Sequence, residues 1–444
     1  MLVSGKTGGQ QLEKQAEQPS SARVVVAGAI GNAIEFYDFT VYAFLASYFA
    51  AHFFPSTDPI AGLLASYATL AVGMIMRPVG GLVLGLVGDQ MSRRFALQLS
   101  VVLIAVPTLI IGLLPTYETI GVLAPILLIV LRMIQGLSVG GEYSSSIVYI
   151  VEHAPPKRRG LWGSFSPMGA FGGLFLGTAV CIVVGSLLGT EEMAAWGWRI
   201  PFIASVLLTA VGFGVRMGLG ADKAILAQAN SESILIRAFR DHWWEMLAIA
   251  LANTSTGVVT FVGFAFAVPW MVQVAGVTRL HALGINLYGL VAVALLSLAG
   301  GALGDHLGRL RVSILGLIVL LAGAWPAFQY MGSPDTTSQV IGITILAIGQ
   351  GFFVGPMCAC MVALVAPQVR TTVVSLGYSI PVGVFGGLAP LVTEFIFARR
   401  GIEMAPALVI IAGAFVSLAA ILIMGRWPYG DPGQAREDRE GVPA

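Results

Sequence analysis

The sequence predicts an all-α membrane protein whose twelve transmembrane helices form two six-helix, pseudo-symmetric halves. Three observations support this fold class: the composition, the spacing of apolar runs, and an internal repeat. The 444 residues are 57% hydrophobic and only 11% charged, whereas a soluble domain carries about twice that charged fraction. The net charge of +1 argues against a nucleic-acid partner, which requires a concentrated basic surface.

Apolar runs separated by polar breaks are each long enough for one membrane helix. We expect twelve, near 24–51, 60–87, 95–115, 120–151, 161–189, 199–219, 244–275, 281–303, 311–332, 339–365, 371–398 and 404–425. Lysine and arginine concentrate on the cytoplasmic side of membrane proteins. Few of the 24 basic residues fall at the other ends of the spans, namely Arg199, Arg279, Arg399 and Arg400. Both termini are therefore predicted to be cytoplasmic, in a multi-pass protein of a bacterial inner membrane.

Polar segments divide the chain into five parts. We expect a disordered cytoplasmic tail at 1–22, a six-helix half at 23–220, an amphipathic cytoplasmic connector at 221–243, a second half at 244–426 and a cytoplasmic tail at 427–444. The first part contains no apolar stretch of the kind found in a cleavable signal peptide.

Four short motifs recur in the second half in the same order, displaced by 212 to 216 residues. The pairs are Gly88-Asp89 with Gly304-Asp305, Gln135-Gly136 with Gln350-Gly351, Ala154-Pro155 with Ala366-Pro367, and Gly169–Leu174 with Gly383–Leu388. Ordered matches at a nearly constant offset indicate an internal repeat. Two such halves are what an alternating-access transporter needs, with its substrate held between them.

Two carboxylates lie inside the first span, which is otherwise apolar. Glu35 and Asp38 are three residues apart, so they share one helical face, and Tyr42 lies on the same stripe. Charged side chains at this depth are costly and usually face a protein interior or a water-filled path. Arg77 and Arg132 lie at a similar depth in the second and fourth spans. Pairing among these four charges would offset the cost of their desolvation.

These four charges have two interpretations. In the first, Asp38 or Glu35 is the proton site, because burial favours the neutral acid and a nearby arginine favours the carboxylate. Arg132 then binds an anionic substrate, since guanidinium holds a carboxylate bidentately, and competition for it couples the two events. In the second, the four form fixed ion pairs that lock helices together. For the set as a whole we favour a function in transport. For Arg77, which precedes Pro78, we favour a structural role that stabilises the second span, and we keep it as a candidate substrate contact.

Other polar residues inside the spans are further candidates. Glu142, next to Gly140-Gly141, could relay protons or pair with a basic loop residue. The candidate substrate contacts that carry no charge are Tyr42, Gln135, Asn253, Tyr288, Gln350 and Tyr378. Such groups set the shape and polarity of a binding site, although each alone could equally make a hydrogen bond between helices.

Two polar loops follow the second and eighth spans at equivalent positions. One contains Asp89, Arg93 and Arg94, and the other contains Asp305 and Arg309. We expect both loops to act as gate latches, because an arginine there can reach the aspartate or a helix end. The positive charges also serve as topology signals.

Five motifs occur in order along the chain. They are G-N-x-x-E-F-Y-D-F at Gly31–Phe39, R-P-x-G-G at Arg77–Gly81, R-x-x-Q-G-x-x-x-G-G-E at Arg132–Glu142, R-R-G at Arg158–Gly160 and W-G-W-R-I-P-F at Trp196–Phe202. With the paired loops, this set resembles the metabolite:proton symporter family of the major facilitator superfamily. The resemblance implies proton-coupled transport of citrate, α-ketoglutarate, shikimate, or proline and betaine. Ser92 departs from the family loop, where glycine is usual, so this loop is expected to turn differently.

We therefore expect a proton-coupled symporter that imports a small organic anion, a di- or tricarboxylate, by alternating access. The alternatives are an osmolyte symporter of the proline and betaine type and, third, a proton-driven efflux transporter. No constellation of metal ligands or nucleophiles suggests an enzyme, and Cys358-x-Cys360 lacks a second ligand pair. The expected cofactor set is empty, with the proton as coupling ion. The expected partners are the organic anion, protons and the lipid bilayer, and one chain holds both halves, as a functional monomer requires.

Overall fold

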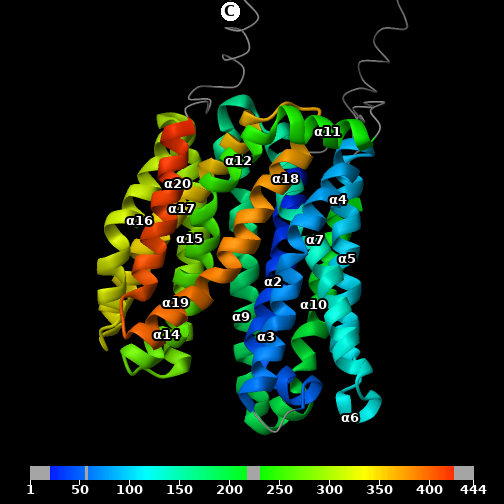
Figure 1. Ribbon diagram of the computed structural model, residues 1–444, viewed down its shortest axis with the longest axis vertical. Coiled ribbons are helices and arrows are strands. Elements are labelled where there is room, and N and C mark those ends of the chain that lie inside the picture. Colours follow the sequence, from blue (N-terminus) through cyan, green and yellow to red (C-terminus); the bar gives the residue numbers. More distant parts are fainter. Residues whose placement is uncertain (1–20, 56–58, 218–230, 425–444) are drawn as a thin grey trace, which may run out of the picture.

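The computed structural model describes residues 21–55, 59–217 and 231–424. The predicted tails at 1–22 and 427–444 lie almost wholly outside these residues, as does the predicted connector up to residue 230. The described chain crosses the molecule twelve times as helices, which confirms the predicted fold class. Figure 1 shows the passes of each half grouped together, with α11 (Ser231–Asp241) at the upper end. We call the end of the bundle at which α11 lies the connector end.

The first half contains six passes and short connecting helices. Its elements are α2 Ser21–Phe53, α3 Pro59–Ile75, α4 Arg77–Gln90, α5 Arg93–Leu113, α6 Tyr117–Ile120, α7 Leu123–His153, η1 Pro156–Arg158, α8 Arg159–Gly163, α9 Phe165–Glu192, η2 Met193–Gly197 and α10 Arg199–Met217. Helices α3 and α4 together form the second pass. Helix α7 is among the most deeply buried, with almost every residue from Gln135 to Val151 shielded.

The second half repeats this plan after α11. Its elements are α12 Trp243–Ala252, α13 Thr254–Val258, η3 Val259–Phe266, α14 Ala267–Val274, α15 Arg279–Leu307, α16 Arg309–Met331, α17 Thr336–Leu364, α18 Arg370–Ile380, η4 Pro381–Gly386, α19 Gly387–Arg400 and α20 Ala405–Met424. Nine passes of the described chain are long and apolar enough to cross a bilayer by themselves. Helices α2 and α10 and the α3–α4 pair complete the twelve.

Three passes are interrupted where the predicted spans were continuous. The second pass breaks at Met76, because Pro78 in the first turn of α4 cannot continue the hydrogen bonding of a preceding helix. The seventh and eleventh passes contain the π-helical segments η3 and η4, the latter starting at Pro381. Such segments are frequent at functional sites. The breaks place Arg77, η3 and η4 near the middle of the bundle.

Glycines bring the inner helices into backbone contact. A Cβ added to Gly140 of α7 would lie 1.7 Å from the carbonyl oxygen of Arg77 in α4. The equivalent contact recurs in the second half, where a Cβ on Gly355 of α17 would lie 2.1 Å from the carbonyl oxygen of Ser297 in α15. Small residues allow this close approach in membrane bundles, where van der Waals packing drives association. The internal repeat therefore corresponds to a repeated packing arrangement.

Candidate functional site

Asp38 of α2 lies at the centre of a buried polar cluster. Its Oδ2 accepts a hydrogen bond from Nη1 of Arg132 at 2.9 Å. Its Oδ1 accepts from Thr108 Oγ1 at 2.8 Å and from Gln135 Nε2 at 3.0 Å. The Arg132 guanidinium also stacks on the ring of Tyr42, with Cζ 3.6 Å from the ring centroid. Four predicted site residues, Asp38, Tyr42, Arg132 and Gln135, therefore lie together in this cluster. Thr108 also belongs to it and was not predicted, because a lone threonine in an apolar span carries no distinctive signal.

Glu35 and Arg77 form a second, separate pair. Both side chains are buried, and Nη2 of Arg77 lies 3.7 Å from Oε1 of Glu35, beyond hydrogen-bond distance. Arg77 Nε and Nη2 are buried and have no hydrogen-bond partner in the described chain. The break at Met76 places Arg77 in the first turn of α4, facing the second half: a Cβ on Gly383 of η4 would lie 3.8 Å from Arg77 Cδ. The four predicted charges are thus divided into two pairs.

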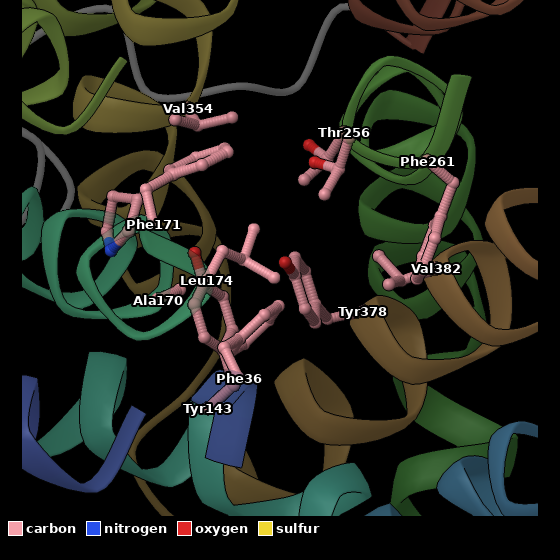
Figure 2. Close-up of a pocket in the computed structure, with 12 residues that line it drawn as sticks. Phe36, Tyr143, Ala170, Phe171, Leu174, Thr256, Phe261, Val354, Tyr378 and Val382 are labelled. Atoms are coloured by element: carbon pink, nitrogen blue, oxygen red, sulfur yellow. The ribbon is translucent and has the colours of Figure 1, made fainter. Parts of the chain in front are cut away.

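A cavity lies between the halves beside the Glu35–Arg77 pair. Each half contributes six lining residues: Phe36, Tyr143, Pro167, Ala170, Phe171 and Leu174 from the first, and Thr256, Thr260, Phe261, Val354, Tyr378 and Val382 from the second. Figure 2 shows these side chains converging from several helices. The space left for water-sized molecules is about 20 Å³, enough for one water molecule or two. None of the lining side chains is charged.

Tyr143 and Tyr378 form a contact between the halves within the cavity wall. Their rings stack with centroids 4.6 Å apart and an interplanar angle of 19°, and Figure 2 shows them side by side. Tyr143 belongs to α7 of the first half and Tyr378 to α18 of the second. Tyr378 was a predicted site residue, whereas Tyr143 was missed, because an aromatic residue in an apolar span is indistinguishable by sequence from core packing.

Two other predicted residues, Gln350 and Asn253, do not line the cavity. Gln350 supports the cavity wall from behind, donating to the Thr256 carbonyl and to Thr260 Oγ1, both at 3.3 Å. Asn253 donates to the Ile249 carbonyl at 2.8 Å, at the junction of α12 and α13, and does not line the cavity.

Tyr288 does not occupy the predicted substrate site. Its side chain is 45% exposed on the outer face of α15, and its hydroxyl lies 3.1 Å from Thr344 Oγ1. The sequence identified Tyr288 as a polar residue inside the eighth span but could not fix the rotation of α15, which packing against α17 determines.

Glu142 is buried on α7 and accepts a hydrogen bond from Ser100 of α5. Ser138, one turn earlier on α7, donates to the Ser100 carbonyl at 2.6 Å. Glu142 therefore belongs to an α5–α7 contact within the first half, between the Asp38 cluster and the connector end.

Asp89 and Asp305 each contact a helix start in the opposite half. Asp89 accepts from the backbone N–H groups of Thr371 and Thr372, at 3.3 and 2.9 Å, where α18 begins. Asp305 accepts from the backbone N–H groups of Gly160 and Leu161 in α8, both at 2.8 Å.

Further polar contacts join the halves nearby. Arg309 donates through Nε to Asp305 at 2.8 Å and through Nη2 to the Pro156 carbonyl at 2.9 Å. Arg370 of α18 pairs with Glu152 of α7 at 2.6 Å. Arg309 therefore contacts both halves, and its role as a gate latch stays a prediction. The side chains of Arg93 and Arg94, also predicted there, lie outside the described part of the structure.

The two loops turn differently, as expected from Ser92. Ser92 has extended backbone (φ −167°) and its hydroxyl accepts from the Phe95 N–H at 3.0 Å, which caps α5. The equivalent Gly308 has φ of 101°, in the region that favours glycine. A serine cap satisfies one of the unpaired N–H groups at a helix start.

The comparisons with known proteins agree with this architecture. Residues 24–219 match the family model described as "Sugar (and other) transporter". The chain is 30% identical over 409 residues to the proline/betaine transporter of Salmonella typhimurium, covering 89% of this chain and 82% of that protein. It is 29% identical over 415 residues to the glycine betaine/proline/ectoine/pipecolic acid transporter OusA of Dickeya dadantii, covering 90% and 83%.

Among solved structures, the fold is similar to that of the proton:xylose symporter XylE, with a TM-score of 0.72. Sequence identity to XylE is 15%, and the match covers 91% of this chain and 95% of that one; another XylE structure, from E. coli, is described as partially occluded and inward open and gives 0.66. This likeness supports the fold. From its repeated halves, its motifs and the relatives it matches over most of their length, the chain is a membrane transporter that belongs to the metabolite:proton symporter family of the major facilitator superfamily.

Proposed function

We propose that this protein is a proton-coupled symporter of a small zwitterionic solute of the proline or betaine type, working by alternating access. The relatives above are named as transporters of such solutes. The cavity between the halves lies where an alternating-access transporter binds its substrate.

The charge balance around the cavity carries the choice of substrate. Glu35 and Asp38 offset Arg77 and Arg132, Glu142 adds a further carboxylate, and the lining residues are uncharged. A zwitterion adds no net charge to this buried region. A di- or tricarboxylate would bring two or three negative charges that nothing in this set neutralises, at a large desolvation cost. The proline and betaine alternative therefore replaces the di- or tricarboxylate as our leading interpretation.

A monovalent carboxylate is the second candidate. Arg77 and Arg132 each retain buried Nε and Nη2 atoms without hydrogen-bond partners in the described chain. Guanidinium groups with free donors are suited to bidentate binding of a carboxylate. Both candidates share this requirement, since zwitterionic solutes such as betaine also carry one carboxylate.

Asp38 is our candidate for the coupling proton. Its carboxylate is held by Arg132, Thr108 and Gln135, so protonation would remove the charge that pairs with Arg132. The guanidinium stays charged, and it would then exchange Asp38 for another partner. Because Arg132 lies on α7, which also carries Tyr143 of the cavity wall, rearrangement of this pair can reach the substrate site through one rigid helix.

The orientation follows from the positive-inside rule and stays a proposal, with the connector end in the cytoplasm of a bacterial cell. The contacts of Asp89, Asp305 and Arg370 between the halves lie at that end. They support a state closed towards the cytoplasm. The proton is the only coupling species that we propose, and a single chain holds both halves of the site.

Uptake into proteoliposomes tests the function. Radiolabelled proline, betaine, citrate and α-ketoglutarate would be compared with and without an imposed pH gradient. We expect proline or betaine to accumulate when the outside is acidic and a protonophore to abolish accumulation. Gradient-driven uptake of citrate without uptake of either zwitterion would overturn the substrate assignment, and insensitivity to the protonophore would overturn proton coupling.

A further inference from the structure

Five of the twelve residues that line the cavity are aromatic, although aromatic residues make up only 9% of the chain. Phe36, Tyr143 and Phe171 come from the first half, and Phe261 and Tyr378 from the second. We call these five side chains the aromatic cage. No charged side chain lines the cavity with them, so the rings are its dominant recognition element.

Aromatic faces attract cations through the ring quadrupole, and the attraction is strongest where both partners are removed from water. An N-methylated ammonium group is especially suited, because it carries a positive charge but needs few hydrogen bonds, and the cage offers few. A carboxylate would find hydroxyl groups but no cationic hydrogen-bond donor among the lining residues. The aromatic cage therefore fits the cationic end of a zwitterion.

The carboxylate end has a candidate partner next to the cage. Arg77 is buried, its Nε and Nη2 lack hydrogen-bond partners in the described chain, and its ion pair with Glu35 is 3.7 Å long. Glu35 directly precedes Phe36 of the cage, and Arg77 approaches Gly383, the neighbour of the lining residue Val382. Arg132, in contrast, is held by Asp38 and stacked on Tyr42 within the first half.

We propose that the aromatic cage binds the ammonium group of the substrate, with a preference for N-methylated ammonium, and that Arg77 binds its carboxylate. This assignment rests on the proposed transport of a zwitterion and deepens it to a substrate class, N-methylated amino acids. It also divides the predicted roles of the arginines: Arg77 contacts substrate, and Arg132 positions the proton site Asp38.

The cage also links substrate binding to the movement of the halves. The unfilled space of about 20 Å³ cannot hold a methylated ammonium group, and Tyr143 stacks directly on Tyr378 across the interface. A cation enters only if these two rings part, so that contact between ring and cation replaces contact between the rings. Ser379, next to Tyr378, donates to the Gly140 carbonyl of α7 at 2.7 Å. Separation of α7 and α18 therefore strains this bond as well.

Equilibrium binding to the purified, detergent-solubilised full chain tests the cage. The ligands form a series of increasing methylation: glycine, sarcosine, N,N-dimethylglycine and betaine. The carbon analogue 3,3-dimethylbutanoate has the shape of betaine without its positive charge. We expect affinity to rise along the series and the carbon analogue to bind at least about tenfold more weakly than betaine. Equal affinities for betaine and its carbon analogue would overturn cation recognition.

Variants assign the effect to the cage. Tyr378→Leu and Phe36→Leu should remove most of the preference for betaine over glycine, whereas Tyr378→Phe, which keeps the ring, should retain it. Phe202→Leu is the matched control, since Phe202 is equally buried but packs around Trp198, away from the cavity. Retention of the full preference in both cage variants would overturn the assignment. The circular dichroism spectrum and thermal transition of each variant establish that it is folded.

Arg77 is tested on the same ligand series. Arg77→Gln should weaken every ligand by a similar factor, about tenfold or more, because all share the carboxylate; Arg77→Lys should recover part of the affinity. Unchanged affinities in Arg77→Gln would overturn the carboxylate assignment. If the wild-type protein accumulates no zwitterion in the proteoliposome assay, the proposed function itself fails. Zwitterion transport with an unaltered methylation preference in the cage variants refutes only the cage.

Discussion

Asp305 of the second half accepts a hydrogen bond through Oδ1 from the backbone N–H of Gly160 in the first half, with an N···O distance of 2.8 Å. Asp89 of the first half makes the equivalent contact with Thr372 of the second at 2.9 Å. Each carboxylate thus caps a helix start in the opposite half, where backbone N–H groups are unpaired and the helix dipole is positive. The internal repeat therefore appears in the structure as a pair of reciprocal contacts between the halves at the connector end, and we predict that they act as gate latches.

We expect Asp305→Asn and Asp89→Asn to favour opening at the connector end. Asparagine keeps an acceptor oxygen but loses the negative charge, and a charged hydrogen bond contributes about 1.5–3 kcal/mol. Alkylation of a cysteine at Ser375, which is buried in α18 one turn beyond Thr372, should accelerate by roughly tenfold or more in each variant. The three native cysteines, Cys181, Cys358 and Cys360, would first be replaced by alanine.

Asp335→Asn is the control for these latch variants. Asp335 also caps a helix start, accepting from the Ser338 N–H at 2.8 Å, but both residues belong to the second half. Its replacement should leave alkylation at Ser375→Cys unchanged. Equal acceleration in all three variants would show that the effect is general destabilisation and would contradict the latch.

The stabilising contribution of the Glu152–Arg370 pair should depend on the two charges being opposite, and not on which of the two residues is the acid and which is the base. Both side chains are partly exposed, so we expect a coupling energy of about 1 kcal/mol. Glu152→Arg alone should lower transport and thermal stability, and the double variant Glu152→Arg/Arg370→Glu should recover both. Lack of recovery would mean that neighbouring contacts of either residue matter more than their attraction.

Asp38→Asn should stop accumulation driven by a pH gradient while leaving exchange of substrate across the membrane. Asparagine can still accept hydrogen bonds from Thr108 and Gln135 but cannot take up a proton. Glu35→Gln is compared in parallel, because Glu35 is the other buried carboxylate of α2. Gradient-driven uptake that survives in Asp38→Asn and is lost in Glu35→Gln would move the proton site to Glu35.

Gly140→Ala should prevent normal packing of α4 against α7. The added Cβ would lie 1.7 Å from the Arg77 carbonyl oxygen, which is backbone and cannot turn aside. We expect little folded protein by size-exclusion chromatography, or a thermal transition lowered by several degrees. Gly172→Ala in α9 is the control, since its Cβ meets nothing within 4 Å. Similar yields of both variants would contradict the importance of this contact.

The choice of partner within the charged set illustrates the limit of sequence reasoning. Depth along each helix placed Glu35, Asp38, Arg77 and Arg132 at one level, and the structure has them there. Which arginine pairs with which carboxylate depends on the rotation and neighbours of each helix. The break at Met76 turns Arg77 towards the second half, and the contact of α5 with α7 brings Thr108 to Asp38.

What the sequence determined by itself was the class of fold, the two repeated halves, the level of the buried charges and the position of the two polar loops after the second and eighth spans. These follow from composition, periodicity and repetition, which are properties along the chain. Only the tertiary structure decided that Tyr143 meets Tyr378, that Arg77 approaches the cavity, and that Tyr288 faces outward. Those facts depend on how helices rotate and pack against partners far away in sequence, because side chains at equal depth can face in any direction.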